Sequence, residues 1–357
     1  MSGLSDLVIT GIGMRCSLGQ DSPGSCAAIR AGISRFSIWP PKSEPDEDAI
    51  IGAAVEPDCG DSDWTEKFED LSAQPLLESL WSAGYADLVD QNSHHLKWAL
   101  FLSIPPFDRE GVDEENVAEF NEKASDDLLF PIEIPDLRPF SNGHAGCLLG
   151  IGEAVEALNS GELDMCIVGG ADSYLETEYV YSLREQKRIK TGQTTAGFIP
   201  GEAAGFVVIE KESHARKRNA PVLARITPVY SSMESIAWDS TEPGRYRAMP
   251  MVLRELISNS PCDPQKINRV INDLNGERWR FLEWAMTNNP ALSSLPPDWR
   301  LWCPADCIGD TGAATGAIHV NLAVQAILRG YAFGQAVLIA NASESGERAA
   351  MLVYSET

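Results

Sequence analysis

Apolar residues recur at helical spacing in the middle of the chain. Residues 148–158 carry Leu, Ile and Val at intervals of three and four, which places them on one face of a helix. The Ser-Gly pair at 160–161 ends this helix, and the apolar residues 165–168 predict a short buried strand after it. Because the first two turns hold no charged side chain, we expect the helix to cross the core of a domain.

The same patterns recur on both sides of this helix. Apolar and β-branched runs predict strands at residues 7–13, 98–104, 222–226, 270–272, 336–340 and 349–354, and the resemblance described below implies a strand pair at 196–210. Helical patterns cover residues 26–32, 75–84, 178–190 and 249–258, and the resemblance described below implies a helix at 212–220 and a loop followed by a helix at 308–318. Two acidic stretches interrupt the order: 37–69 is expected to be surface loop with short elements, and 108–128 an exposed helical excursion.

Several motifs resemble those of the β-ketoacyl-acyl-carrier-protein synthases, within the thiolase superfamily. They are Val-Ile-Thr-Gly-Ile-Gly at 8–13, Gly-Ile-Gly-Glu-Ala at 150–154, Gly-Gly-Ala at 169–171, Gly-Glu-Ala-Ala-Gly at 201–205 and Gly-Ala-Ala-Thr-Gly at 312–316. The resemblance implies an α/β, thiolase-like fold with two similar βαβαβ halves in a layered α-β-α-β-α arrangement. We expect one half at residues 1–220, with the acidic stretches as insertions, and the other at 221–357.

The resemblance also implies where an active site would lie. These synthases hold the acyl group on a cysteine at the N-terminus of the central helix, and aligning the chain on 150–154 and 169–171 puts His144 there. Of the two catalytic histidines of the family, one is replaced by Asp310. Leu274 or Asn275 replaces the other, depending on whether a one-residue slip is allowed.

The loop that supplies part of the family's oxyanion hole is replaced as well. Residues 343–348, around Gly346, read Ser-Glu-Ser-Gly-Glu-Arg. Decarboxylative condensation needs a thiolate, groups that stabilise an enolate and an oxyanion hole, and an ionised carboxylate at position 310 would repel the enolate. We therefore expect no catalytic residue, with His144, Asn275, Asp310 and Gly346 as vestigial active-site positions.

Two alternative interpretations would leave the protein with catalytic activity. Cys147, one helical turn beyond His144, would be a displaced nucleophile, although the leucines that follow it favour packing. His144 as a base oriented by Asp310, with Asn275, would form a hydrolytic constellation. The same three residues would equally make a hydrogen-bonded cluster that fills the vacant pocket, and we favour this second interpretation.

The amino-acid composition limits the classes of molecule that the protein is expected to bind. The 357-residue chain has a net charge of −24, which argues against nucleic acid and anionic membranes and favours a basic protein. No apolar run reaches the roughly 18 residues of a membrane span. The eight cysteines lie in apolar or helical contexts typical of reduced thiols, so we expect a cytoplasmic protein. Neither Cys303 with Cys307 nor the pair His94–His95 completes a metal site, and we expect no metal or cofactor.

These expectations favour a catalytically inactive protein that uses the fold as a binding platform, adaptor or chaperone. The resemblance extends to degenerate synthase-like proteins encoded near type VI secretion effectors, which makes such an effector a candidate client. It also extends to non-catalytic partner subunits of active synthases in fatty-acid or polyketide synthesis, which is the alternative. The family dimerises through a strand before the central helix, here residues 130–137, so the resemblance implies a homodimer or a heterodimer with a related chain.

Overall fold

The computed structural model describes residues 6–41, 48–56, 64–85, 96–107, 109, 114–125, 130–236, 238–240, 242 and 246–355. The strands are β1 (Leu7–Cys16), β2 (Ser37–Trp39), β3 (Ile50–Gly52), β4 (Trp98–Ser103), β5 (Leu137–Phe140), β6 (Met165–Ser173), β7 (Glu202–Lys211), β8 (Ala224–Ile226), β9 (Tyr230–Met233), β10 (Ile267–Asn272), β11 (Arg300–Trp302), β12 (Ala336–Ala342) and β13 (Glu347–Tyr354).

The helices alternate with these strands along most of the chain. They are α1 (Ser22–Arg30), α2 (Trp64–Ser82), α4 (Glu114–Ser125), α5 (Gly146–Ser160), α6 (Thr177–Glu185), α7 (Glu212–Lys217), α8 (Ala248–Ser258), α9 (Arg278–Ala291), α10 (Ala305–Ile308) and α11 (Thr315–Leu328), with short 3₁₀ turns η1 (Gly143–Ala145), η2 (Pro264–Lys266) and η3 (Gly312–Ala314).

The main sheet has the strand order β11-β10-β12-β13-β8-β1-β7-β6-β4-β5, with β9 paired to β13. Its two ends repeat one pattern. In one, β5, β4 and β6 are parallel and β7 and β1 antiparallel; in the other, β11, β10 and β12 are parallel and β13 and β8 antiparallel. This repeat gives two similar halves joined through β8, whereas the boundary at residues 220 and 221 stays a prediction.

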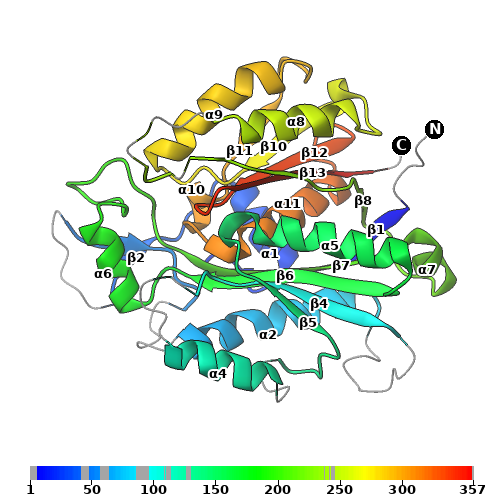
Figure 1. The fold of residues 1–357 in the computed structure, drawn as a ribbon, viewed down its shortest axis with the longest axis horizontal. Coiled ribbons are helices and arrows are strands. Elements are labelled where there is room, and N and C mark those ends of the chain that lie inside the picture. The colour runs from blue at the N-terminus through cyan, green and yellow to red at the C-terminus, as the bar shows by residue number, and fades with distance from the viewer. Residues whose placement is uncertain are drawn as a thin grey trace.

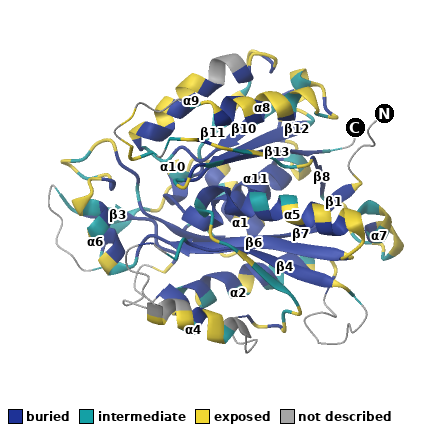
Figure 2. Cartoon of the chain, viewed as in Figure 1, coloured by how far each residue is buried: buried dark blue, intermediate teal, exposed yellow. Residues whose placement is uncertain are grey.

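The helices form three layers around the two parts of the sheet (Figure 1). The outer layers are α2 with α4 and α8 with α9, while α1, α5 and α11 lie between the sheets. The predicted layered α-β-α-β-α arrangement is confirmed. Figure 2 shows the consequence for burial, because α11 up to Ala326 and most of the central strands are buried while the outer helices expose one side.

The sequence of α11 explains why it can lie inside the protein. All residues from Thr315 to Gln325 are buried, and none of them is Lys, Arg, Asp or Glu. A helix apolar on all sides is stable only where protein surrounds it. The apolar residues of α5 pack into the same central cluster, and Gly161, with φ of 77°, ends α5 in a left-handed cap.

Several predicted elements differ from the structure. Of the strand pair expected at 196–210, the structure has the strand β7 (Glu202–Lys211). The helix expected at 75–84 begins at Trp64, inside the stretch interpreted as loop, because apolar side chains on both sides of Pro75 pack on the sheet. The helix expected at 178–190 ends at Glu185. The strand expected at 130–137 lies instead at residues 137–140, as β5 on the edge of the sheet.

Candidate functional site

Two equivalent turns meet in the middle of the molecule. The turn η1 leads into α5, and η3 leads into α11, at matching places in the two halves. Each turn begins with a glycine of positive φ, 54° at Gly143 and 47° at Gly312, a backbone conformation that side chains other than glycine rarely adopt. The turns contact each other, so the side chains that follow these glycines face a common site.

His144, in η1, forms a buried pair with Asp310. Its Nε2 lies 2.7 Å from Oδ1 of Asp310, and both side chains are 3% exposed. Asp310 also accepts hydrogen bonds from Nδ2 of Asn275, at 2.6 Å, and from the amide of Gly312, at 2.9 Å. Leu274 instead lies in the apolar cluster beneath α8 and α9, so Asn275 is the residue that reaches the site.

The carboxylate of Asp310 determines the hydrogen-bonding role of the histidine. Burial alone would raise the pKa of Asp310, but the interaction and hydrogen bond with His144, together with Arg280 and Asn275, hold it well below its usual range. An ionised carboxylate can only accept hydrogen bonds, so Nε2 of His144 carries the hydrogen. That nitrogen therefore has no free electron pair for nucleophilic attack.

Arg280, from α9, faces the same imidazole. Its Nη2 lies 3.1 Å from Nδ1 and 3.3 Å from Nε2 of His144, and its Nη1 donates to Oδ2 of Asp273 and to the carbonyl of Ala342, both at 2.8 Å. A buried guanidinium thus covers the approach to the second ring nitrogen. Together, Asp310 and Arg280 leave His144 without a nitrogen that is both unprotonated and open.

Sequence reasoning did not find Arg280. A usable signal lies in the helical pattern, because Arg280 is four residues from the buried Trp284 and therefore points toward the core. Its acidic partner Asp273 directly follows the strand β10. A charged residue on the buried face of a helix usually has such a partner.

The backbone around His144 is also held by hydrogen bonds. Nδ2 of Asn341 donates to the His144 carbonyl at 2.9 Å, and Oδ1 of Asn341 lies 2.9 Å from Nδ1 of His319. Burial lowers the pKa of His319 to about 4, so this second histidine is neutral at pH 7. Oγ of Ser343 accepts the amide hydrogen of Ala145 at 2.9 Å. A donor at the start of α5 is thereby already used.

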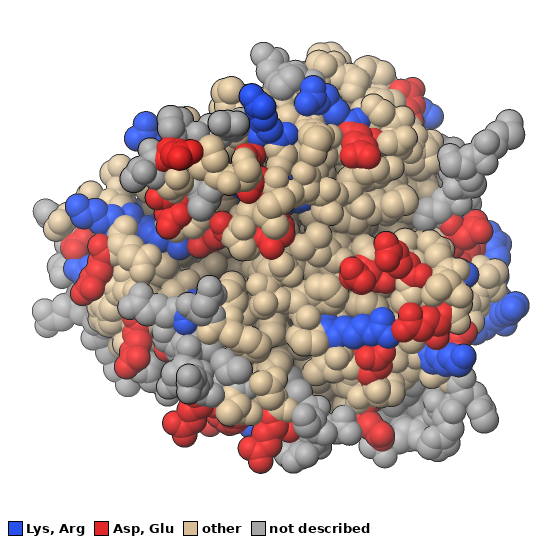
Figure 3. Space-filling view, in the orientation of Figure 1, with Lys and Arg blue, Asp and Glu red and all other residues tan. Residues whose placement is uncertain are grey.

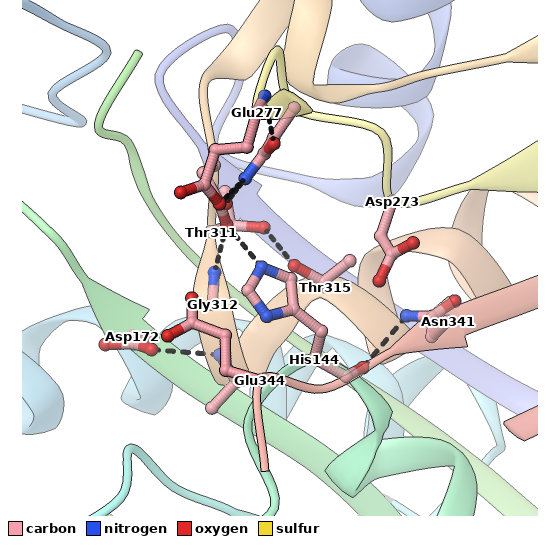
Figure 4. Close-up of polar contacts among 12 residues, drawn as sticks. His144, Asp172, Asp273, Glu277, Thr311, Gly312, Thr315, Asn341 and Glu344 are labelled. Atoms are coloured by element: carbon pink, nitrogen blue, oxygen red, sulfur yellow. Dashed lines mark hydrogen bonds and ion pairs between the residues drawn. The ribbon is translucent and has the colours of Figure 1, made fainter. Parts of the chain in front are cut away.

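An open cavity of about 610 Å³ leads to His144. Its walls combine aromatic and polar groups: Pro106, Phe107, Arg109, Ser141, Gly143, His144, Asp172, Tyr174, Tyr179, Trp238, Glu344 and Ser345. Figure 4 shows that the His144 ring lies between Glu344 on one side and Asp273 on the other. The cavity therefore reaches the side chain of His144.

One ion pair lines this cavity, and a second ion-pair group reaches it through Glu344. Arg109 donates to Asp172 at 2.6 Å, and Asp172 accepts the amide of Ala313 at 2.9 Å. Arg188 binds Glu277 at 2.8 Å and Glu344 at 2.5 Å. Burial would raise the pKa of Glu344, but the charge and hydrogen bonds of Arg188 hold it below its usual range, so Glu344 is ionised at neutral pH.

The other predicted positions lie outside this contact network. Cys147 is fully buried where α5 crosses α11 at Gly316, and burial raises the pKa of its thiol to about 12. Gly346 lies in the turn between β12 and β13 with φ of 112°, against Met233 and the carbonyl of Glu234. The structure thus brings His144, Asn275 and Asp310 together, and places Cys147 and Gly346 elsewhere.

The structure also shows where Cys303 and Cys307, considered above as metal ligands, lie. Cys307 is buried with Sγ 3.8 Å from the carbonyl of Ile29, and burial raises the pKa of Cys303 to about 12. Among the residues that the structure describes, no three His, Cys, Asp or Glu side chains gather as metal ligands. His94 and His95 lie outside the described residues. No helix in the described part of the chain has the length and apolar character needed to cross a membrane.

Comparison with known proteins adds sequence and structural relatives. The family described as "Beta-ketoacyl synthase, N-terminal domain" matches residues 144–215. The 3-oxoacyl-[acyl-carrier-protein] synthase homolog of Saccharomyces cerevisiae is 27% identical over 184 residues, covering 47% of this chain and 40% of that protein. Nodulation protein E of Rhizobium leguminosarum bv. trifolii is 23% identical over 295 residues, covering 73% of this chain and 71% of that protein.

Solved structures show the same fold over nearly the whole chain. The AntDE:AntF structure, a type II polyketide acyl-carrier protein with its ketosynthase, aligns with a TM-score of 0.78 and 13% identity, covering 98% of this chain and 99% of that one. The ishigamide ketosynthase/chain length factor aligns with a TM-score of 0.75 and 15% identity, at the same coverage. By contrast, the match spans less than half the length of the yeast relative.

Proposed function

We propose that this chain, a β-ketoacyl-synthase-like protein with the thiolase-type fold, does not catalyse condensation and acts as a binding subunit for another protein. One observation carries the proposal. The residue at the position of the family's nucleophilic cysteine, His144, is enclosed between Asp310, at 2.7 Å, and Arg280, at 3.1 Å. Nucleophilic catalysis requires an accessible electron pair, and the hydrogen bonds of this imidazole remove it.

The surroundings of His144 oppose the remaining steps of a condensation. A decarboxylated malonyl unit develops negative charge, which these synthases stabilise with imidazoles and backbone amides. Here the carboxylate of Glu344 lines the cavity, the carboxylate of Asp310 lies against His144, and Ser343 already accepts the hydrogen of the Ala145 amide. Cys147 cannot substitute, because its thiol is buried in the contact between α5 and α11.

The charge of the chain supports a basic protein as the partner. Asp and Glu number 52 against 28 Lys and Arg. On the face drawn in Figure 3, acidic side chains are spread among basic ones and uncharged surface. A surface with excess negative charge attracts positively charged partners through long-range electrostatics. We therefore propose an adaptor or chaperone for a basic client, with a type VI secretion effector as a candidate.

A specific observation favours a second candidate, a non-catalytic partner subunit of an active synthase. The strand β5 ends the sheet order, so its outer edge has no neighbour among the described strands. An open strand edge can pair with another chain. Structural neighbours with the same fold include a ketosynthase/chain length factor, which makes a heterodimer with a related synthase chain the form this role would take.

The unpaired cysteines are the basis for a proposal on the location of the protein in the cell. All cysteines in the described part of the chain are free, and six of these seven are buried. Proteins with many unpaired cysteines are typical of reducing compartments. We therefore propose a cytoplasmic protein.

Intact-mass spectrometry after incubation with acyl-coenzyme A thioesters tests the loss of catalysis. We expect no mass increase, because no accessible nucleophile faces the cavity. An active ketoacyl synthase treated in parallel supplies the positive control. A stable acyl adduct that disappears in His144→Ala or Cys147→Ala would contradict the proposal.

A further inference from the structure

Among the described residues that line the cavity beside His144, the most exposed charged side chain is negative. Among the charged side chains that line the cavity, Glu344 has a side chain 31% exposed, while those of Arg109 and Asp172 are 4% and 2% exposed. Arg188, beneath Glu344, is 8% exposed. Glu344, which also binds Arg188, is therefore the more exposed partner of this ion pair.

The nearby guanidiniums already have carboxylate partners. Arg109 binds Asp172 at 2.6 Å, Arg280 binds Asp273 at 2.8 Å, and Arg188 binds two carboxylates. An anionic ligand would have to displace a carboxylate from one of these buried pairs, which leaves that carboxylate buried without its partner. The guanidiniums near the cavity therefore disfavour the binding of malonyl and other anionic groups.

The walls of the cavity suit a cation. Trp238 and Tyr179 each already pack against a guanidinium, with Arg188 and Arg109 both 4.4 Å from the ring centroids. Aromatic faces attract cations through the ring quadrupole. The volume of about 610 Å³ falls within the range of about 300–1,000 Å³ typical of small-ligand sites.

We infer that this cavity binds a positively charged amine or guanidinium group, with Glu344 as its counter-charge and Trp238 as an aromatic wall. The inference deepens the proposed function and rests on it, because a condensing enzyme would need the same cavity for an acyl and a malonyl group. Two sources share the required chemistry. The cation is a Lys or Arg side chain of the protein client, or it is a small free amine.

Isothermal titration calorimetry on the full chain tests the inference. The probes are agmatine as the free amine, acetyl-Gly-Arg-Gly-amide as the peptide, and adipate as an anion of similar length. We expect at least one cationic probe to bind and adipate not to bind. Glu344→Gln should weaken the cation at least tenfold, whereas Glu255→Gln, an exposed carboxylate on α8, should change it less than twofold.

The outcomes either distinguish the two sources of the cation or overturn the inference. Binding of both cationic probes supports the inference for either source. Binding of the peptide but not agmatine assigns a client side chain, and the reverse assigns a free amine. Binding of adipate alone, binding of no probe, or equal effects of the two substitutions would overturn the inference. Trp238→Ala should also weaken the cation at least tenfold, and circular dichroism checks that each variant is folded.

The proposed function and this inference fail separately. A stable acyl adduct would remove the inactive-protein proposal whatever the cation titration gives. A cavity that binds no cation, in a protein that forms no acyl adduct, would remove only the inference.

Discussion

Replacing Asp310 by Asn tests the contact that closes the site. The carboxylate accepts three hydrogen bonds, from Nε2 of His144, Nδ2 of Asn275 and the amide of Gly312. Asparagine has one acceptor oxygen, so it can keep the hydrogen bonds from His144 and Gly312, which both reach Oδ1 of Asp310. Its amide nitrogen would then face Nδ2 of Asn275, which is also a donor. Asp310→Asn therefore removes a charge-assisted bond and leaves another donor unsatisfied.

The expected loss follows from these contacts. A hydrogen bond to a charged group contributes about 1.5–3 kcal/mol, and an unsatisfied buried donor adds to the loss, so Asp310→Asn should lower the free energy of unfolding by about 2–4 kcal/mol. For 357 residues, an unfolding entropy of about 2.1 cal/mol/K per residue converts this to a fall of about 3–5 °C in Tm. Urea unfolding and calorimetry at pH 7 measure both quantities.

The pH dependence gives a second readout. Because the folded pKa of Asp310 is lowered, its contribution is fully present above the unfolded value of about 3.9 and is lost as the pH falls through the folded pKa. The difference in stability between the native chain and Asp310→Asn should therefore be constant from pH 5 to 7 and shrink below about pH 4. A double-mutant cycle with His144→Gln should show coupling of about 0.5–3 kcal/mol.

Two results would refute this reasoning. One is a stability change below about 0.5 kcal/mol, the size of an ordinary surface substitution. The other is a pair of substitutions whose effects simply add, because additivity would mean that His144 and Asp310 do not interact in solution.

Three further predictions follow from the same contacts. Arg280→Met should destabilise the fold by about 3–5 kcal/mol, because Asp273 loses its buried partner, and a loss under 1 kcal/mol in urea unfolding would contradict this. Cys147 should resist iodoacetamide in the folded protein at pH 8, since burial raises its pKa to about 12, and peptide mapping that shows rapid alkylation there would disprove the packing. His144→Cys should not restore condensation with a malonyl thioester, because Asp310 and Glu344 remain; product formation by mass spectrometry would show otherwise.

Much of the fold could be predicted from the sequence because the motifs that indicate it are short and continuous in the chain. Gly-Ile-Gly-Glu-Ala at 150–154 and Gly-Gly-Ala at 169–171 fixed the positions of α5 and β6, and the structure has both elements there. The boundaries were less predictable. Proline at 75 indicates a helix start, yet α2 continues through it because Phe68 and Leu71 pack into the same apolar cluster as Leu76.

The site was predictable where a motif gave the register. His144 and Asp310 come from aligned motifs, and the structure places them 2.7 Å apart. Arg280, Arg188 and Arg109 come from segments with no recognised motif. Their roles depend on contacts between residues far apart in the chain, such as Arg280 with His144, and no local pattern specifies such pairs.

Decarboxylation of a malonyl thioester by the purified chain is the most direct test of the central claim, that the inherited site has lost its nucleophile and its enolate-stabilising groups. We predict that carbon dioxide release matches that of buffer alone. Release above that background, abolished by His144→Ala and retained by Glu255→Gln, would contradict the account.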